Sequence, residues 1–412
     1  MPLTYTQNHL TLIQGTHKID LVELAKNMDQ AFYLYDIDGS LERLKLFQKL
    51  VDPIEIYFSL KSNNNKALVQ SFLKEGAGLD IVSKGELEHS LNLKCSPKKI
   101  VFSGVAKTKQ ELEKALRSQI FQINVESLEE LERIGSLCSS LKLKAQVACR
   151  VNPNVTLDTH AFIQTGTKDH KFGIDENALP QFIEIVRKYS SFVQFQGLAM
   201  HIGSQGLSVD PLIQASEKVK NIYERLNREG HSLTTLDIGG GVGIDYRTND
   251  MEDDIRRIEF YGSSLQKVFK NFEGRLLCEP GRILTARYGW LFGEIQYIKK
   301  TSLRNFAILN TGMHHLMRPV LYQAYHRILP VKQSNQEEKN YTIAGPICES
   351  ADILARDRLL PALSSGDWLC ICDAGAYGAV MSQTYNMQDI PLEIAYSQGA
   401  IASKEEFQHK TK

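Results

Sequence analysis

The chain has 412 residues, of which 42% are hydrophobic, so it is long enough to form more than one core. Its 48 basic residues balance 48 acidic residues, and a formal net charge of zero gives no indication of a nucleic-acid partner. No apolar run reaches transmembrane length and residues 1–9 are too polar for a secretory signal, so we expect no membrane association.

The first predicted strand, residues 31–36, precedes a long region in which eight short apolar runs alternate with stretches of helical periodicity. Such an alternation sets successive strands parallel through right-handed crossovers. It predicts an α/β fold, an eight-stranded parallel (β/α)8 barrel, whose reactive groups lie at the C-terminal ends of the strands. The expected strands are residues 54–61, 78–83, 100–104, 122–126, 146–152, 195–203, 235–241 and 275–282.

Three of the helices between these strands have a clear start signal. Ser83, Thr108 and Ser127 are each followed, three residues later, by a glutamate. We expect each pair to form a capping box, in which the hydroxyl and the carboxylate each accept a hydrogen bond from an exposed backbone amide.

The alternation of strands and helices ends after Arg282. Strand-like segments follow without long helices between them, which predicts a C-terminal antiparallel β-domain that the N-terminal segment joins. We expect the barrel to cover residues 37–284, and the β-domain to comprise residues 1–36 and 285–412. The strand-like segments are residues 290–298, 305–310, 340–344 and 368–372.

The seven cysteines are odd in number and scattered, a pattern typical of reduced thiols in a cytoplasmic protein. Cys370 and Cys372 would share one face of a strand. No second cysteine pair or histidine cluster accompanies them, so we expect no metal site.

The first and seventh strands end in residues suited to a phosphorylated aldehyde. Lys61 could be an ordinary solvated lysine, but partial desolvation at a barrel mouth would favour a neutral, nucleophilic amine. The seventh strand runs into residues 239–243, which contain four glycines whose amides can approach an anion closely. This run does not match the dinucleotide-binding fingerprint, because Ile244 stands where that pattern has a glycine.

The other strand ends add further polar groups. Glu279 could simply form a salt bridge, but a carboxylate at this place could also keep a heteroaromatic nitrogen protonated. His201 could stack on a planar cofactor, and the fifth and second strands contribute Arg150 and Asp80. With a lysine and a phosphate cradle, these are the groups that pyridoxal phosphate requires.

Nearly the whole chain, from residues 32–36 to residues 385–386, resembles the fold-type III pyridoxal-phosphate-dependent decarboxylases. Within that family, it is most similar to the branch that acts on diaminopimelate. The most specific blocks are residues 57–63, 102–105, 150–153, 171–173, 201–205, 279–282, 345–350 and 373–377.

The resemblance implies a role for each barrel residue in binding the cofactor. Lys61 bonds covalently to the aldehyde, Glu279 faces the pyridine nitrogen and His201 stacks on the ring. The remaining implied cofactor contacts are Ser204, Gly240, Gly241, Gly281 and Tyr377 at the phosphate, Arg150 near the ring hydroxyl, and Asp80 and Arg282.

The resemblance also implies that the β-domain completes the active site. Cys348, which would be a buried small hydrophobe in most proteins, protonates the substrate carbon after carbon dioxide leaves. Glu349 binds the distal amino group, and the distal carboxylate meets arginines and tyrosines: Arg282, Arg318, Tyr322 and Tyr377. A bidentate cation suits a carboxylate and an anion suits an ammonium, whereas ornithine would need no arginine there. The expected reaction is decarboxylation of meso-2,6-diaminopimelate to L-lysine and carbon dioxide, the last step of lysine biosynthesis.

Other readings of the sequence remain open at this point. The chain could decarboxylate another amino acid, such as ornithine or lysine. A non-catalytic relative would be expected to lack Lys61 or Cys348, and a racemase would place an arginine against the pyridine nitrogen. By resemblance, we expect a homodimer with shared active sites, in which Cys348, Glu349 and Tyr377 come from the partner chain. Residues 170–173 are the loop that we expect to close over the substrate.

Overall fold

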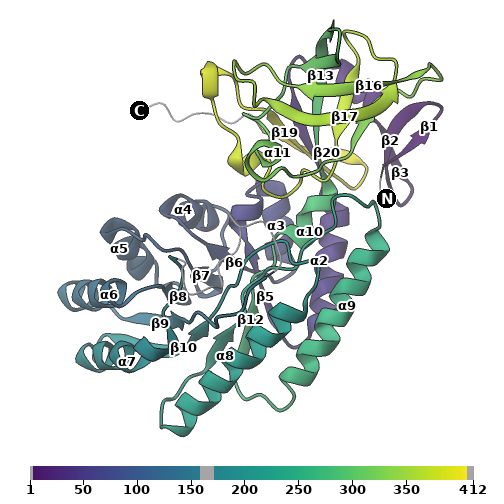
Figure 1. Cartoon of the computed structure of the whole chain (residues 1–412). Helices are drawn as coiled ribbons and strands as arrows, with labels where there is room; N and C mark the ends of the chain where they lie inside the picture. The colour runs from purple at the N-terminus through teal and green to yellow at the C-terminus, as the bar shows by residue number, and fades with distance from the viewer. Residues whose placement is uncertain (1–2, 158–170, 406–412) are drawn as a thin grey trace.

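The computed structural model describes residues 3–157 and 171–405 and contains a barrel and a β-domain that lie side by side (Figure 1). Eight parallel strands, β5 to β12, close into the barrel, with β12 hydrogen-bonded to β5. The predicted (β/α)8 barrel is therefore confirmed. Its strands are β5 Glu55–Ser59, β6 Gly78–Ile81, β7 Ile100–Phe102, β8 Gln122–Val125, β9 Ala145–Arg150, β10 Val193–Ala199, β11 Thr235–Asp237 and β12 Arg275–Cys278.

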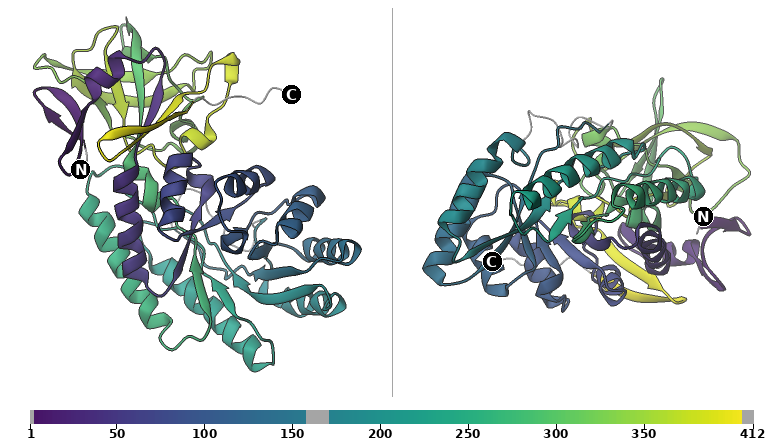
Figure 2. Two further views of the ribbon diagram at one scale, coloured as in Figure 1. Left: turned by 180° about the vertical axis from the view of Figure 1, so that it is seen from behind. Right: turned by 90° about the horizontal axis from the view of Figure 1, so that it is seen from below.

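Helices surround the barrel on its outer face, as the two further views in Figure 2 show. They are α2 Ile37–Val51, α3 Lys66–Lys74, α4 Lys84–Asn92, α5 Lys109–Ser118, α6 Leu128–Leu141, α7 Leu179–Lys188, α8 Asp210–Arg228 and α9 Met251–Val268. The helix starts expected from the sequence are present, but only Thr108 and Glu111 form the reciprocal capping box. Glu86 and Glu130 instead accept hydrogen bonds from the amide one residue before the cap, because these carboxylates reach back toward the strand ends.

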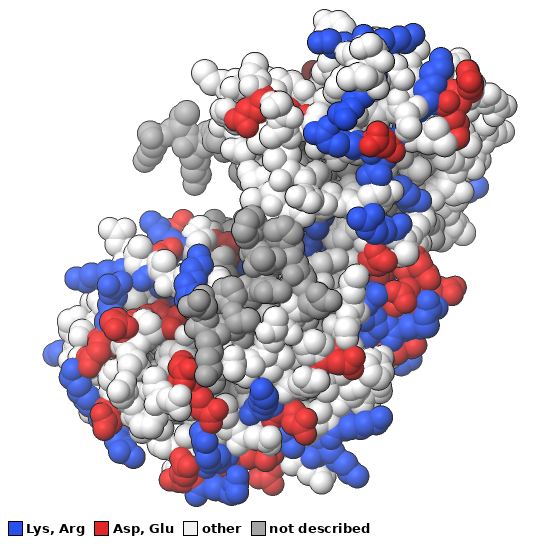
Figure 3. Space-filling model, viewed as in Figure 1, with Lys and Arg blue, Asp and Glu red and all other residues white. Residues whose placement is uncertain are grey.

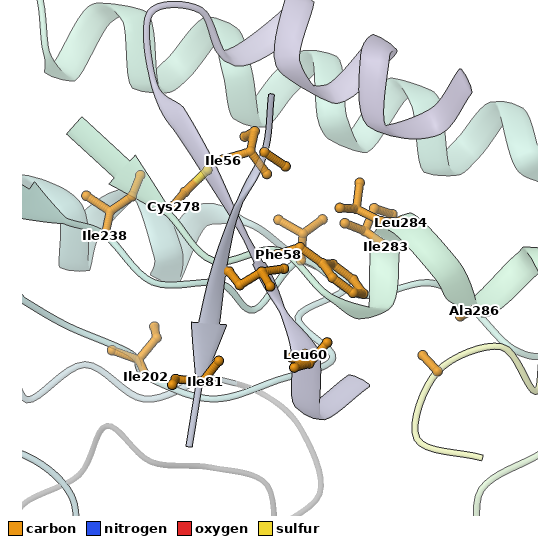
Figure 4. Packing of buried hydrophobic residues seen from close by; sticks show 14 of the residues in the cluster. Ile56, Phe58, Leu60, Ile81, Ile202, Ile238, Cys278, Ile283, Leu284 and Ala286 are labelled. Carbon is orange, nitrogen blue, oxygen red and sulfur yellow. The ribbon is translucent and has the colours of Figure 1, made fainter. Parts of the chain in front are cut away.

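One hydrophobic cluster joins the first barrel strand to the short helix that follows the last barrel strand. Figure 4 shows Phe58 and Leu60 of the first barrel segment in the same packed cluster as Ile283 and Leu284 of the short helix α10 (Arg282–Thr285). All four side chains are buried. Since Lys61 directly follows Leu60, this packing fixes the backbone that presents the lysine.

The β-domain is a sheet in the order β17-β16-β14-β13-β4-β19-β20. β4 lies between β13 and β19, so the N-terminal segment joins this domain as expected. The sheet is not purely antiparallel, because β4 pairs parallel to β19 and β14 pairs parallel to β16. In both pairs the strands are far apart along the chain and no tight turn forces them to run antiparallel. The strands are β4 Phe32–Asp36, β13 Gly289–Lys300, β14 Asn305–Leu309, β15 Ile328–Pro330, β16 Glu338–Ala344, β17 Ile353–Pro361, β18 Trp368–Ile371, β19 Leu392–Ser397 and β20 Ala400–Glu405.

A small antiparallel sheet precedes β4 and was not predicted. It contains β1 (Leu3–Thr6), β2 (His9–Gln14) and β3 (His17–Asp20), and the helix α1 (Leu21–Lys26) follows it. The amide of Leu10 in β2 donates a 2.8 Å hydrogen bond to the carbonyl of Val331. This sheet therefore packs against the edge of the β-domain.

Lysine and arginine side chains are interspersed with aspartate and glutamate over the face in Figure 3. Within residues 3–157 and 171–405, no helix is long and apolar enough to cross a membrane. Over the same residues, no cluster of three or more His, Cys, Asp or Glu side chains could hold a metal ion.

Candidate active site

A cavity of about 240 Å³ lies at the C-terminal ends of the barrel strands. Both domains line it, since Tyr322 and Tyr377 follow the barrel in the chain. The structure thus brings together eight of the predicted site residues around one cavity. They are Lys61, Arg150, His201, Ser204, Glu279, Arg282, Tyr322 and Tyr377.

Lys61 lies in a short 3-10 turn, Leu60–Ser62, directly after β5. Its Nζ donates a 2.5 Å hydrogen bond to Asp80, whose side chain is fully buried at the end of β6. Burial lowers the pKa of Lys61, but the negative charges of Asp80 and Glu279 outweigh it and hold this pKa above its ordinary value. Desolvation acts on Lys61 as expected, but the adjacent Asp80 carboxylate opposes it and favours the protonated amine.

Glu279 follows β12 and shares the barrel interior with another carboxylate. Ser103 Oγ donates to Glu279 Oε1 at 3.3 Å, and the Asn124 amide donates to Asp237 Oδ2 at 3.2 Å. Burial and the charges of Asp237 and Asp80 raise the pKa of Glu279 well above its ordinary value, and burial raises the pKa of Asp237 to about 6. The raised pKa means that this carboxyl binds a proton more readily than an ordinary glutamate does.

His201 and the glycine run form a surface for a flat, phosphorylated molecule. The amide of Gly240 donates to His201 Nδ1 at 3.2 Å. Burial, with the charges of Lys61 and Arg150, lowers the pKa of His201 well below its ordinary value, so the ring is neutral. Gly239 and Gly241 have positive φ angles, and a Cβ on Gly240 would lie 2.2 Å from the carbonyl oxygen of Glu279. This close backbone approach fits the predicted phosphate cradle.

Arg150 is oriented by a buried glutamate that the sequence did not single out. Arg150 Nη1 donates to Glu126 Oε1 at 2.5 Å, and Glu126 also accepts from the amide of Gly173 at 2.9 Å. Phe172 lines the cavity, and the Arg150 guanidinium lies 5.1 Å from its ring centroid. The loop expected to close over the substrate begins at residue 170, which lies outside the described residues.

Two arginines lie at the β-domain side of the cavity. Arg282 donates to the Tyr246 hydroxyl at 2.9 Å and to Ser204 Oγ at 2.8 Å. Arg318 does not line the cavity itself; it is 4% exposed, lies 4.1 Å from the Tyr246 ring centroid and donates to His326 Nε2 at 2.7 Å. In the part of the chain that the structure describes, no carboxylate forms an ion pair with either guanidinium.

This pair of cations creates a site for an anion. Burial, with the neighbouring charge of Arg282, lowers the pKa of Arg318 to about 10, so the residue remains charged at neutral pH. Two buried guanidinium groups without a carboxylate partner attract a carboxylate or phosphate.

The structure does not bring every predicted residue to this cavity. Cys348 and Glu349 are exposed and do not line it. Tyr377, which we expected from a partner chain, lies in the same cavity as Lys61, and its amide donates to the carbonyl of Ser62 at 2.8 Å. That expectation for Tyr377 is wrong, because the loop after β18 folds back against the first barrel strand of its own chain.

Several residues near the cavity were not predicted from the sequence. Asn124 and Asp237 are polar residues inside apolar strands, and a carboxylate at such a position is a signal that could have been used. Tyr246 and His326 lie in loops without a recognisable pattern. Their role depends on contacts with Arg318 that only the folded chain creates.

The barrel region of the chain matches a known protein family. A family model described as "Pyridoxal-dependent decarboxylase, pyridoxal binding domain" matches residues 39–286, which is well over half of the chain. The chain belongs to the pyridoxal-dependent decarboxylases.

Relatives with known names are similar over most of their length. The diaminopimelate decarboxylase of Zymomonas mobilis is 40% identical over 385 residues, covering 92% of this chain and 90% of the relative. The crystal structure of diaminopimelate decarboxylase from Helicobacter pylori with L-lysine matches with a TM-score of 0.87 at 33% identity, over 94% of this chain and 95% of that one. The enzyme from M. jannaschii in complex with L-lysine has the same TM-score at 31% identity, over 95% and 93%.

Proposed function

We propose that the protein decarboxylates meso-2,6-diaminopimelate to L-lysine and carbon dioxide, the last step of lysine biosynthesis. The observation that carries this proposal is the pair of buried guanidinium groups on the Tyr246 ring: Arg282 lines the Lys61 cavity, and Arg318 lies beside the same ring. Diaminopimelate keeps a carboxylate at its non-reacting end, and these arginines suit it. Relatives named for this activity, one of them 40% identical, support the same reaction.

The residues of the cavity fit pyridoxal phosphate. Among the described residues, neither Asp80 Oδ1 nor Arg282 Nε has a hydrogen-bond partner, so polar groups remain for a ligand. When bound, pyridoxal phosphate supplies an electron sink for the carbon–carbon bond that breaks. We propose that Lys61 holds its aldehyde, His201 lies against its ring and Glu279 faces its nitrogen. The phosphate would lie against Ser204, Gly240, Gly241, Gly281 and Tyr377, with Arg150 at the ring hydroxyl.

The chain's own groups would then control protons and orientation. As a carboxylate, Glu279 would keep a proton on the pyridine nitrogen, and hydrogen bonds from Ser103 and Asn124 would hold it in place. Arg282 and Arg318, with Tyr322, would hold the distal carboxylate and so orient the reacting end. Cys348 would donate the proton that replaces the lost carboxyl group.

The proposed active unit is a homodimer. Cys348 and Glu349 are exposed and away from the cavity of their own chain, so a second chain would supply them. This would leave Tyr322 and Tyr377 in the chain that carries Lys61. We further propose domain limits of residues 37–284 for the barrel and residues 1–36 with 285–412 for the β-domain. A cytoplasmic location agrees with cysteines that form no disulfide in the described part of the chain.

Incubation of the purified protein and cofactor with meso-diaminopimelate tests the proposal. We expect stoichiometric release of L-lysine and carbon dioxide. A parallel panel with ornithine, L-lysine and the other diaminopimelate stereoisomers measures substrate choice. Faster turnover of ornithine or lysine than of diaminopimelate would refute the assignment and favour the alternative decarboxylase. Sedimentation of the holoenzyme as a monomer would refute the shared active site.

A further inference from the structure

The Cys348–Glu349 segment is held by side chains from a separate turn of the β-domain. Tyr385 Oη donates a 2.5 Å hydrogen bond to Glu349 Oε1, and Asn386 Oδ1 accepts from the amide of Cys348 at 3.2 Å. Both residues belong to the 3-10 turn η7 (Tyr385–Met387). This turn therefore contacts the proposed proton donor and the proposed ammonium ligand at the same time.

The turn that carries Tyr385 is itself fixed. Ser382 Oγ donates to the carbonyl of His315 at 3.0 Å, and the amide of Gln383 donates to the carbonyl of His314 at 2.8 Å. The ring of the buried His315 also lies 2.8 Å from the carbonyl oxygen of Asp389 through Nε2. Hydrogen bonds before and after the turn thus hold it against one buried loop, and Tyr385 extends from a rigid base.

The backbone of the cysteine segment is fixed by a different group. Asp352, 2% exposed, accepts from the amide of Ile347 at 2.7 Å and from the amide of Met313 at 2.6 Å. The backbone therefore does not need Tyr385. The Glu349 side chain is exposed, and a free glutamate side chain has many rotamers to lose on binding a ligand. The hydrogen bond from Tyr385 selects one of them in advance.

The protonation states suit this arrangement. The hydrogen bond to Glu349, together with its negative charge, raises the pKa of Tyr385, so the hydroxyl stays protonated and donates at neutral pH. Oε1 accepts that hydrogen bond, and Oε2 keeps its lone pairs for a second donor. An ammonium group approaching Glu349 would find the carboxylate already oriented.

We propose that Tyr385 is a positioning residue that fixes the Glu349 carboxylate for the ammonium group at the distal end of the substrate. It would thereby favour substrates that carry a complete amino-acid group at the non-reacting end. The inference rests on the proposed function, in which Glu349 binds that ammonium. Tyrosine suits the task because its rigid side chain loses little conformational entropy.

The Tyr385→Phe variant of the holoenzyme tests the proposal. It keeps the ring and removes only the donor hydroxyl. We expect the Michaelis constant for diaminopimelate to rise about five- to tenfold, with kcat within twofold and the cofactor absorbance unchanged, as for loss of one ordinary hydrogen bond at an exposed site. Tyr297→Phe is the matched control, since Tyr297 in β13 is 69% exposed. An unchanged Michaelis constant, or an equal rise in the control, would overturn the proposal.

A double-mutant cycle separates positioning from a general structural effect. In a Glu349→Ala background, Tyr385 has no carboxylate to orient, so Tyr385→Phe should leave the Michaelis constant unchanged. Additive effects of the two substitutions would show that Tyr385 acts independently of Glu349 and would refute the proposal.

Binding of L-lysine distinguishes this inference from the proposed reaction. L-Lysine retains the amino-acid group of the end that does not react, and calorimetric titration of the holoenzyme measures its affinity without turnover. We expect Tyr385→Phe to weaken L-lysine binding by the same five- to tenfold factor. If the wild type binds L-lysine but does not decarboxylate diaminopimelate, the proposed reaction fails while a weaker Tyr385→Phe complex still supports the positioning role. If Tyr385→Phe binds L-lysine as tightly as the wild type does, the positioning role fails whatever the reaction is. A wild type that does neither would end both proposals.

Discussion

Replacement of Arg318 by alanine gives the sharpest test of substrate choice. The guanidinium is 4% exposed and is held between the Tyr246 ring and His326, so water cannot replace it easily. Truncating one member of a buried charge pair costs about 2–5 kcal/mol, because the partner charge is left without compensation. At about 1.4 kcal/mol for each factor of ten, the affinity for diaminopimelate should fall at least about 30-fold.

Steady-state kinetics with diaminopimelate, together with absorbance of the bound cofactor, measure this effect. We expect a large rise in the Michaelis constant and full cofactor binding. Arg358→Ala is the matched control, because Arg358 stacks on Tyr325 at 4.0 Å and not on the Tyr246 ring that Arg282 and Arg318 share. A rise of less than threefold for Arg318→Ala, or an equal rise for the control, would refute the assignment of Arg318 to the distal carboxylate.

Three further outcomes follow from the site and its surroundings. Cys348→Ala should lower kcat by about 10²–10⁴-fold, the usual contribution of a positioned acid, while cofactor binding stays unchanged. Normal turnover of this variant would exclude Cys348 as the proton donor. Gly240→Ala places a Cβ 2.2 Å from the Glu279 carbonyl oxygen. It should lower the free energy of urea unfolding by about 1–3 kcal/mol and weaken cofactor binding. A stable variant that binds cofactor normally would contradict the close approach. Burial lowers the pKa of His315 to about 4, so its contribution to stability is present above pH 6.5 and is lost as pH falls toward 4. Between pH 7.5 and pH 5, the wild type should lose about 2 kcal/mol more unfolding free energy than His315→Gln, and equal losses would refute this.

The barrel could be predicted because its strands are short, apolar and regularly spaced. Lys61, His201 and Glu279 each follow such a strand directly, and parallel strands bring their C-terminal ends to one rim. The expected strands ran past the observed ends, since residues after Ser59 or Asp237 leave the sheet to build the site. The position of a residue after a barrel strand was therefore enough to predict that it lies at the site.

The β-domain half could not be derived in the same way. Its small N-terminal sheet uses strands of four to six residues with many polar side chains, and these carry little periodic signal. The parallel pairing of β4 with β19 joins segments at opposite ends of the chain. Such pairings, like the contact of Tyr377 with the segment after β5, depend on tertiary packing and leave no local pattern. The contact of Lys61 with Asp80 was missed for the same reason, because Asp80 reaches the lysine from another strand.

The Asp352 carboxylate has a consequence for how the two halves of the site move. One of its oxygens holds the amide of Met313, a few residues before Arg318, and the other holds the amide of Ile347, next to Cys348. An asparagine there would offer a single acceptor and would turn its own amino group toward one of the two amides. The Asp352 side chain thus couples the two loops, so a displacement of one loop also displaces the other. In the proposed dimer, Cys348 serves the cavity of the partner chain. Substrate binding beside Arg318 in one site would therefore shift the cysteine that serves the other site.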